Sequence, residues 1–407
     1  MSVFLPDQKW QHQEGLKDLI KALGGDSMIR FVGGSVRDTL LGLPVSDIDC
    51  ATRHHPEKTM ELIRSAGFKA IPTGIQHGTI TALLPTKCPV EITSLRRDVS
   101  TDGRHATIAY SDNWEDDAQR RDFTINALYA EAESGLVHDY FGGLADLKAH
   151  SVRFIGNPET RIAEDHLRIL RYFRFFARFG GKNPDPDALA ACIKRANDLM
   201  ALSRERIASE ILKILALPDP LAVITLMIQS GIFKPILPEI TADSIPPLKR
   251  LLERERLYQL SGNALLHLAA LLPEGAEMAR SVAQRLRFSK EQKKYLIALL
   301  TEEEEKPLSL AWAIGKDEAI ARLLLSDRDE STVDSAIALL KNWERPVFPL
   351  KGGDLIAKGL PAGPLVATIL QKIQKAWVEA DFPNSDWVQE KAALAIAETM
   401  ATHKAER

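Results

Sequence analysis

The pattern of hydrophobic and polar positions changes character near residue 158. Before that point, short runs rich in Val, Ile and Thr predict four strands, at Met28–Gly34, Val45–Ala51, Gly78–Leu84 and Pro89–Arg96. Pro56–Phe68 begins with proline and has glycine near its end, which predicts a helix. Beyond residue 158, apolar positions recur with helical spacing to the end of the chain. We therefore predict an α+β head followed by an all-helical remainder.

Composition narrows the class of protein only a little. The 407 residues are 45% hydrophobic and 26% charged, which is typical of a globular protein of two to four domains. The net charge of −3 weakly opposes broad electrostatic capture of nucleic acid, although local basic patches decide such binding. The first fifteen residues lack a secretory signal pattern, and three scattered cysteines suit a reducing compartment, so we expect a cytoplasmic protein.

Two aspartates interrupt the predicted strand Val45–Ala51. If the strand is regular, Asp47 and Asp49 point to the same face because side chains alternate with period two. Two carboxylates held close together repel unless a cation lies between them, and Mg²⁺ prefers such oxygen ligands. Glu91 could supply a third oxygen if its strand lies alongside. The alternative is a pair of ordinary solvated turn residues.

A glycine pair precedes these acids and favours the metal interpretation. Gly33 and Gly34 lie between a predicted strand and the helix-like VRDTLLG. Such a turn lets backbone N–H groups approach a phosphate without obstruction by Cβ. Arg37 follows one helical step later and could add a charge-assisted contact to the same phosphates. Together these residues predict a site for a triphosphate and a metal.

The order of the motifs resembles the tRNA CCA-adding enzyme and bacterial poly(A) polymerase family, a class II branch of the polymerase β-like nucleotidyltransferases. GGSVRD, LLG and DID carry the resemblance in the head, and further matches follow in the same order. They are RRDFTINAL (Arg120–Leu128), DYFGGLADL (Asp139–Leu147), EDHLRILRYFRF (Glu164–Phe175), LSRERIASEI (Leu202–Ile211) and FPLKGGDLIAKGLPAGPLV (Phe348–Val366).

The resemblance implies an architecture and an activity. The architecture is a small mixed sheet with helices as the catalytic head (1–150), a helical neck with the nucleotide-selecting helix (151–235), a helical body (236–345) and a helical, tRNA-binding tail (346–407). The activity is template-independent addition of CCA to tRNA 3′ ends from CTP and ATP. Asp47 and Asp49 would hold two Mg²⁺ ions, whereas Glu91 could ligate a metal, accept the 3′-hydroxyl proton or only support its strand.

The predicted helix Glu164–Phe179 carries the residues that could read the base. Asp165, Arg168, Arg171 and Arg174 recur every three residues along one side. The opposite side is apolar and predicts the core face, with Ile169, Leu170, Phe173, Phe176 and Ala177. Cytosine and adenine both present an amino donor beside a ring-nitrogen acceptor, which Asp165 and Arg168 could pair. Arg171 and Arg174 would then serve the triphosphate or shape the pocket; the alternative is a solvated basic face.

The motif RRDFTINAL resembles the ribose-binding motif of the family. Arg121, Asp122 and Asn126 are therefore candidates for the ribose hydroxyls. The alternative is a structural Arg–Asp pair. The polar stretch Arg96–Asp112 resembles the family's mobile loop, and its Arg104 and His105 could steer the nucleotide.

Candidate RNA contacts lie in the helical half of the chain. Arg285, Arg287 and Lys290 form a basic segment, and Lys351 opens a glycine-punctuated one; the alternative for each is a solvated helix face. Within the family, the competing functions are poly(A) polymerase and enzymes that add only CC or only A. Outside it, the competitor is a non-catalytic RNA-binding module.

Overall fold

The computed structural model describes residues 2–101, 106–301 and 306–405. By contacts between residues the chain divides into two compact units, Met1–Ala242 and Asp243–Arg407. Among the described residues, no helix combines the length and apolar character needed to span a membrane.

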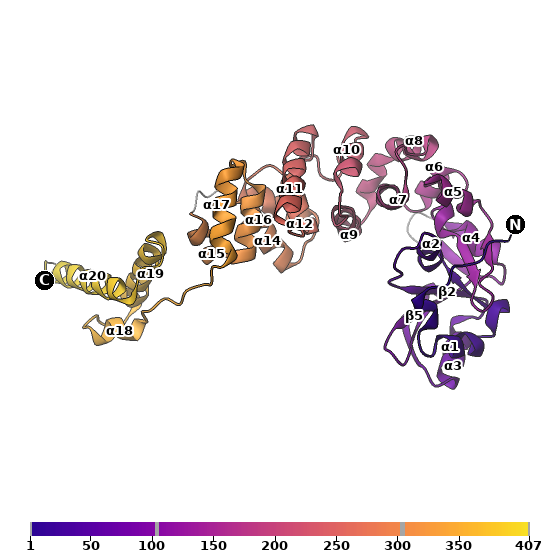
Figure 1. Cartoon of the computed structure of the whole chain (residues 1–407), viewed down its shortest axis with the longest axis horizontal. Helices are drawn as coiled ribbons and strands as arrows, with labels where there is room; N and C mark the ends of the chain where they lie inside the picture. Colours follow the sequence, from indigo (N-terminus) through magenta and orange to yellow (C-terminus); the bar gives the residue numbers. More distant parts are fainter. Residues whose placement is uncertain (1, 102–105, 302–305, 406–407) are drawn as a thin grey trace. The chain divides into compact units, whose positions relative to one another are not determined.

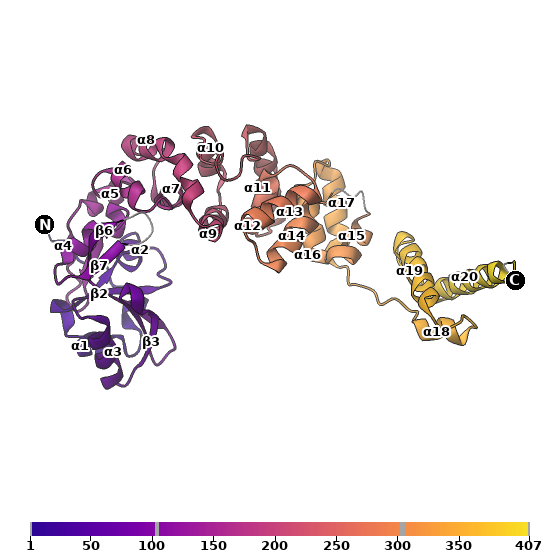
Figure 2. The ribbon, with the colours of Figure 1, turned by 180° about the vertical axis from the view of Figure 1, so that it is seen from behind.

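The first unit begins with a mixed seven-stranded sheet, whose strand order is β3-β4-β5-β2-β1-β8-β9 (Figures 1 and 2). Its strands are β1 (Ile29–Val32), β2 (Ile48–Thr52), β3 (Lys69–Gly74), β4 (Thr79–Leu83), β5 (Pro89–Ser94), β8 (Leu128–Glu131) and β9 (Val137–Asp139). Only β2 and β5 pair in parallel, and every other neighbouring pair is antiparallel. The predicted small mixed sheet is therefore confirmed.

The register of the parallel pair places the acidic residues beside one another. Asp49 on β2 lies opposite Glu91 on β5. The flanking residues Ile48 and Cys50 are buried, while Asp49 is half-buried and Glu91 exposed. Because side chains alternate along a strand, the apolar neighbours anchor β2 in the core and leave Asp49 on the other face.

Two strands lie apart from the main sheet. β6 (Arg96–Thr101) and β7 (Ala106–Tyr110) form a separate antiparallel hairpin. The polar stretch Arg96–Asp112 was expected to be a loop, so the described part of the hairpin corrects that expectation. The reason is that cross-strand hydrogen bonds stabilise it although its polar sequence lacks an apolar alternation. The proposed steering residues Arg104 and His105 lie outside the described residues.

Helices of the first unit cover the sheet and continue beyond it (Figure 1). Those of the head are α1 (Leu16–Ala22), α2 (Gly34–Leu40), α3 (Pro56–Ser65), α4 (Trp114–Gln119) and α5 (Gly143–Ala149). Those after the head are α6 (Pro158–Glu164), α7 (Arg168–Phe179), α8 (Pro186–Lys194), α9 (Arg204–Leu215) and α10 (Leu221–Gln229). The boundaries between head, neck, body and tail, expected at residues 150, 235 and 345, stay predictions.

The second unit is helical throughout its described residues. Its helices are α11 (Ile245–Tyr258), α12 (Ala264–Leu271), α13 (Ala276–Arg285), α14 (Lys290–Leu300), α15 (Pro307–Ile314), α16 (Lys316–Leu325), α17 (Glu330–Lys341), α18 (Gly352–Ala357), α19 (Pro364–Glu379) and α20 (Ser385–Ala405). Arg254 of α11 is buried and donates hydrogen bonds to the carbonyls of Leu324, Ser326 and Arg328. These carbonyls follow or end α16, so the guanidinium satisfies groups that a helix end leaves without partners.

Candidate active site

Three acidic residues, Asp47, Asp49 and Glu91, interact electrostatically at the parallel pair β2 and β5. Asp47 is exposed and immediately precedes β2, because the strand predicted from Val45 begins three residues later, at Ile48. Ser46 Oγ donates to Asp47 Oδ2 at 2.8 Å. Asp49 and Glu91 are cross-strand neighbours, which confirms that the Glu91 strand lies alongside.

The electrostatics of Asp49 suit a cation. Burial, together with the neighbouring Glu91 and Asp47, raises the pKa of Asp49 to about 6, although Arg121 and Arg37 act to lower it. A half-buried carboxylate beside two other acids experiences repulsion that a divalent metal would remove. Within the described ranges no group of three His, Cys, Asp or Glu side chains forms a complete metal cage. The donor set therefore fits a metal that takes its remaining ligands from water and substrate phosphates, as Mg²⁺ does.

The glycine turn lies between these acids and the arginines. Gly33 is buried with φ of +68°, and Gly34 begins α2. A Cβ on Gly33 would lie 3.3 Å from Arg121 Nη1, and one on Gly34 would lie 3.9 Å from Asp49 Oδ2. The turn thus brings backbone next to both a guanidinium and a candidate metal ligand, as expected for a phosphate-binding loop.

Gly33→Ala should impair both folding and nucleotide addition. The left-handed backbone costs an alanine roughly 1–3 kcal/mol, and its Cβ would crowd Arg121. We expect a lower melting temperature and weaker CTP binding, measured by thermal unfolding and by isothermal titration. Gly67→Ala is the matched control, because Gly67 also has a positive φ but its Cβ would meet open space. Equal loss of CTP affinity in both variants would contradict a specific role for Gly33.

Arg37 is engaged within the fold. Its guanidinium is buried, stacks over Phe179 at 4.1 Å, and donates to Asn126 Oδ1 at 2.5 Å and to Asp38 Oδ1 at 2.8 Å. Its predicted contact with phosphates would require the side chain to leave or share these partners. In this arrangement Arg37 joins α2 to Asn126 and to the neck helix α7.

The candidate ribose residues belong to the same network. Asp122 Oδ1 accepts from Asn126 Nδ2 at 3.0 Å, and Asp122 Oδ2 accepts from Arg171 Nε at 2.8 Å. Burial acts to raise the pKa of Asp122, but Arg171 and Asn126 lower it below its usual value. The carboxylate of Asp122 forms its ion pair with Arg171, whereas Arg121 of the same motif contacts Tyr129 and Asp117. The structure therefore brings Asp122 and Asn126 together with Arg171 of α7.

Arg121 has two partners that the sequence did not single out. Its Nε donates to the hydroxyl of Tyr129 at 3.1 Å, and its Nη2 donates to Asp117 Oδ2 at 3.2 Å. These partners raise the pKa of Arg121 against the opposing effect of burial. Arg121 is thus placed at the glycine turn and within electrostatic reach of Asp49.

The expected helix Glu164–Phe179 is two elements. α6 ends at Glu164 and α7 begins at Arg168, so Asp165 lies in the connection and not on the helical face. Asp165 Oδ1 accepts from the amide of Leu167, an interaction that stabilises this short non-helical turn. The prediction of one continuous helix is therefore wrong.

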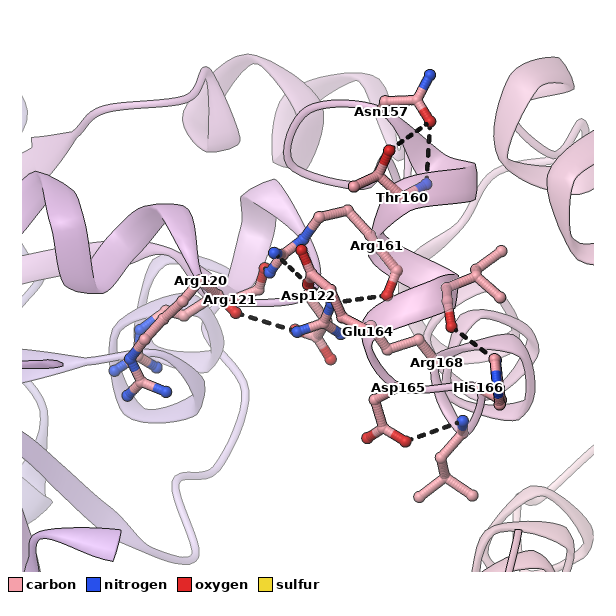
Figure 3. A network of polar contacts seen from close by, with 12 residues as sticks. Arg120, Arg121, Asp122, Asn157, Thr160, Arg161, Glu164, Asp165, His166 and Arg168 are labelled. Carbon is pink, nitrogen blue, oxygen red and sulfur yellow. Dashed lines mark hydrogen bonds and ion pairs between the residues drawn. The ribbon is translucent and has the colours of Figure 1, made fainter. Parts of the chain in front are cut away.

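Asp165 and Arg168, expected to act as a pair, have separate partners. Arg206 of α9 donates to both oxygens of Asp165, at 3.0 and 2.7 Å. Arg168 donates to Glu164 Oε2 at 2.5 Å and to the carbonyls of Arg161 and Arg120. Figure 3 shows Asp165 apart from this Arg161–Glu164–Arg168 network, with the Arg120 and Arg121 side chains pointing away from it. Reading a base with both residues would require Asp165 to exchange or share its contact with Arg206.

The rest of α7 also differs from a simple two-faced helix. Arg174 donates to Glu210 Oε2 at 2.7 Å, and its guanidinium lies over Phe175. Ala177 is exposed, so its assignment to the core face is wrong, and Phe176 is only partly buried. The buried residues are Ile169, Leu170, Tyr172, Phe173, Phe175 and Phe179. This wider buried face arises because α7 packs against both α9 and α10.

The candidate RNA residues lie in the second unit. Arg285 ends α13, Arg287 follows it, Lys290 begins α14, and Lys351 precedes α18. Arg287, Lys290 and Lys351 are exposed, whereas Arg285 is half-buried. Their contact with RNA stays a prediction.

Two family models match the chain. Residues 29–153 match the poly A polymerase head domain, and residues 183–244 match the probable RNA and SrmB-binding site of polymerase A. The first match covers the sheet, the three acids and the glycine turn. It defines the class of protein as a nucleotidyltransferase.

Full-length relatives narrow this class. The mitochondrial CCA tRNA nucleotidyltransferase 1 of Danio rerio is 33% identical over 378 residues, covering 88% of this chain and 85% of its own length. The CCA-adding enzyme of Lacticaseibacillus paracasei is 30% identical over 385 residues, covering 91% and 92%. The crystal structure of the Bacillus stearothermophilus CCA-adding enzyme in complex with CTP is 26% identical with a TM-score of 0.74, covering 98% of this chain and 100% of that one. The chain belongs to the CCA-adding enzyme and poly(A) polymerase family, and the resemblance inferred from its motifs is confirmed.

Proposed function

We infer that the chain adds CCA to the 3′ end of tRNA, using CTP and ATP as substrates. The observation that carries this conclusion is the similarity to a CCA tRNA nucleotidyltransferase along nearly the whole chain, 33% identical over 88% of it. The head alone would also fit a poly(A) polymerase, since the model that matches it is described in those terms. The enzyme therefore forms phosphodiester bonds at an RNA end and releases pyrophosphate.

The chemistry proposed for the head is positioning and charge neutralisation. Asp47 and Asp49 would hold the divalent metal, which we propose to be Mg²⁺ because every available ligand is a carboxylate oxygen. When bound, two such ions lower the pKa of the RNA 3′-hydroxyl and neutralise charge on the leaving pyrophosphate. Glu91 supports this site as the cross-strand neighbour of Asp49. The Gly33–Gly34 turn and Arg121 would bind the triphosphate beside it.

The proposed choice of base depends on the neck. A carboxylate accepts a hydrogen bond from the exocyclic amino group of cytosine or adenine, and an arginine donates to the adjacent ring nitrogen. Uracil and guanine present the reverse order and leave both groups unpaired. We propose Asp165 and Arg168 for these roles, with Arg171, Arg174, Asp122 and Asn126 maintaining the pocket through the ion pairs and hydrogen bonds described above.

Partner and compartment are proposed from the remaining features. Arg285, Arg287, Lys290 and Lys351 are the proposed contacts with the tRNA body. All three cysteines are free thiols, which supports a reducing compartment such as the cytoplasm. Some relatives carry a mitochondrial name, so localisation in cells is the direct test of this point.

End sequencing of reacted tRNA tests the proposed activity. Pure protein is incubated with tRNA transcripts ending at the discriminator base, at C and at CC, with each nucleoside triphosphate singly and together. Addition that stops after CCA, and that is lost on chelation of divalent metal, is the expected result. Long A tails would assign the chain to poly(A) polymerases, and addition of CC or A alone to a partial relative. No addition to any transcript would contradict a catalytic role.

A further inference from the structure

One buried carboxylate beside the active site receives four hydrogen bonds. Asp117 of α4 is 1% exposed. Its Oδ1 accepts from Arg120 Nε at 2.8 Å and from the backbone amide of Arg96 at 3.3 Å. Its Oδ2 accepts from the Tyr129 hydroxyl at 2.6 Å and from Arg121 Nη2 at 3.2 Å. Burial acts to raise its pKa, but Arg121 and Arg120 hold that pKa at about 2, so the group is ionised.

The Oδ2 side of Asp117 fixes the orientation of Arg121. Tyr129 is fully buried and donates its hydroxyl to Asp117 while accepting from Arg121 Nε. A guanidinium held at both Nε and Nη2 cannot rotate in its own plane. The remaining Nη1 is the atom that lies 3.3 Å from a Cβ on Gly33. The contacts with Asp117 and Tyr129, here called the Arg121 anchor, therefore determine which edge of the Arg121 guanidinium faces the glycine turn.

The Oδ1 side connects this anchor to the point where the β6–β7 hairpin begins. Arg96 is the first residue of β6, and its amide donates to Asp117. The preceding residue, Leu95, donates to the carbonyl of Thr52 at the end of β2. Asp117 thus joins three elements: the β6 root, the helix α4 that carries it, and the β8 strand that carries Tyr129.

We propose that Asp117 and Tyr129 are positioning residues for nucleotide transfer, which hold the Arg121 guanidinium beside the Gly33–Gly34 turn and connect it to the first amide of β6. This inference rests on the proposed function, because it assigns a purpose to Arg121 in triphosphate binding. An ordinary structural ion pair would need only one of these two acceptors for Arg121. Neutralising the charge of Arg121 requires only the carboxylate. The added phenol, which hydrogen-bonds to both the carboxylate and Arg121, also restricts the orientation of the guanidinium.

Tyr129→Phe is the sharpest test, because it removes one hydroxyl and keeps the ring. We expect kcat for C addition to fall about 10-fold while KM for CTP changes less than about threefold, since the misplaced guanidinium loses contacts to developing charge. In Asp117→Asn, kcat for C addition should fall about 100-fold. If Asp117→Asn fails to fold, Tyr129→Phe still tests the inference. In an Arg121→Ala background, Tyr129→Phe should cause no further loss. Free guanidinium should restore activity to Arg121→Ala and restore less when Tyr129→Phe is added.

Arg120→Gln is the matched control, because Arg120 contacts the other oxygen of Asp117. It should lower thermal stability slightly and leave kcat near that of the wild type. Two results would overturn the inference. One is a kcat of Tyr129→Phe equal to that of the wild type, and the other is the same loss of kcat from Tyr129→Phe in the wild-type and Arg121→Ala backgrounds. If the wild type transfers no nucleotide, the proposed function fails, and hydrogen exchange of the Arg121 Nε–H decides the positioning. Faster exchange in Tyr129→Phe supports it, and unchanged exchange refutes it.

Discussion

Asp49→Asn should reduce nucleotide addition by about 10³-fold or more and should leave the fold intact. The substitution keeps the shape of the side chain and removes a proposed metal ligand, and the metal accounts for most of the charge stabilisation in such transfers. Folding should not suffer, because burial and the neighbouring Glu91 and Asp47 raise the pKa of Asp49 to about 6. The folded state therefore disfavours the ionised carboxylate, and a neutral amide relieves that repulsion above pH 6.

Single-turnover addition of C to a tRNA transcript measures the activity, and thermal unfolding at pH 8 measures the stability. We expect the melting temperature of Asp49→Asn to equal or exceed that of the wild type, and tRNA affinity to be unchanged. Asp18→Asn is the control, because Asp18 is an exposed acid of α1 in the same unit. Residual addition within about 10-fold of the wild type would exclude Asp49 as a metal ligand.

The local features of the active site could be predicted from the sequence. Asp49 is on a strand, Gly33 and Gly34 form the turn into a helix, and Glu91 lies on a strand alongside. Each of these follows from patterns within a few residues, such as β-branched runs and glycine before a helix. The strands β3, β8 and β9 were not predicted. β8 and β9 have only four and three residues, and β3 has six residues of which none is buried, so the sheet completes these strands through pairing.

The partners of the charged residues could not be predicted in the same way. Asp165 meets Arg206, which is 41 residues later, and Arg171 meets Asp122, which is 49 residues earlier. Helical spacing placed Asp165 and Arg168 on one face, but the chain breaks its helix between them. Ion pairs between distant segments depend on how the neck helices pack, and the periodicity of one helix contains no information on that packing. Asp117 and Tyr129 were missed for the same reason.

Asp165→Ala should reduce discrimination between CTP and UTP by about 10–100-fold and should affect the rate with CTP less. A hydrogen bond to a charged group contributes about 1.5–3 kcal/mol, which converts to that range of selectivity. The pair with Arg206 predicts a second effect. Both oxygens of Asp165 accept from Arg206 before substrate is present, so the incoming base competes with an ion pair whose partners are 45% and 32% exposed. Arg206→Gln should therefore keep the preference for CTP over UTP and change mainly KM.

The ratio of kcat/KM for CTP to that for UTP, on a tRNA ending at the discriminator base, gives the discrimination for each variant. Glu159→Ala is the control, because it removes an exposed ion pair with Lys194 in the same unit without touching Asp165. Unchanged selectivity in Asp165→Ala would refute its role in reading the base. Loss of selectivity in Arg206→Gln equal to that in Asp165→Ala would instead show that the carboxylate needs Arg206 to hold its orientation. The two single variants and the double variant thus separate two roles, direct contact of Asp165 with the base and orientation of Asp165 by Arg206. If Arg206 orients Asp165, the losses of selectivity in the single variants do not add in the double variant.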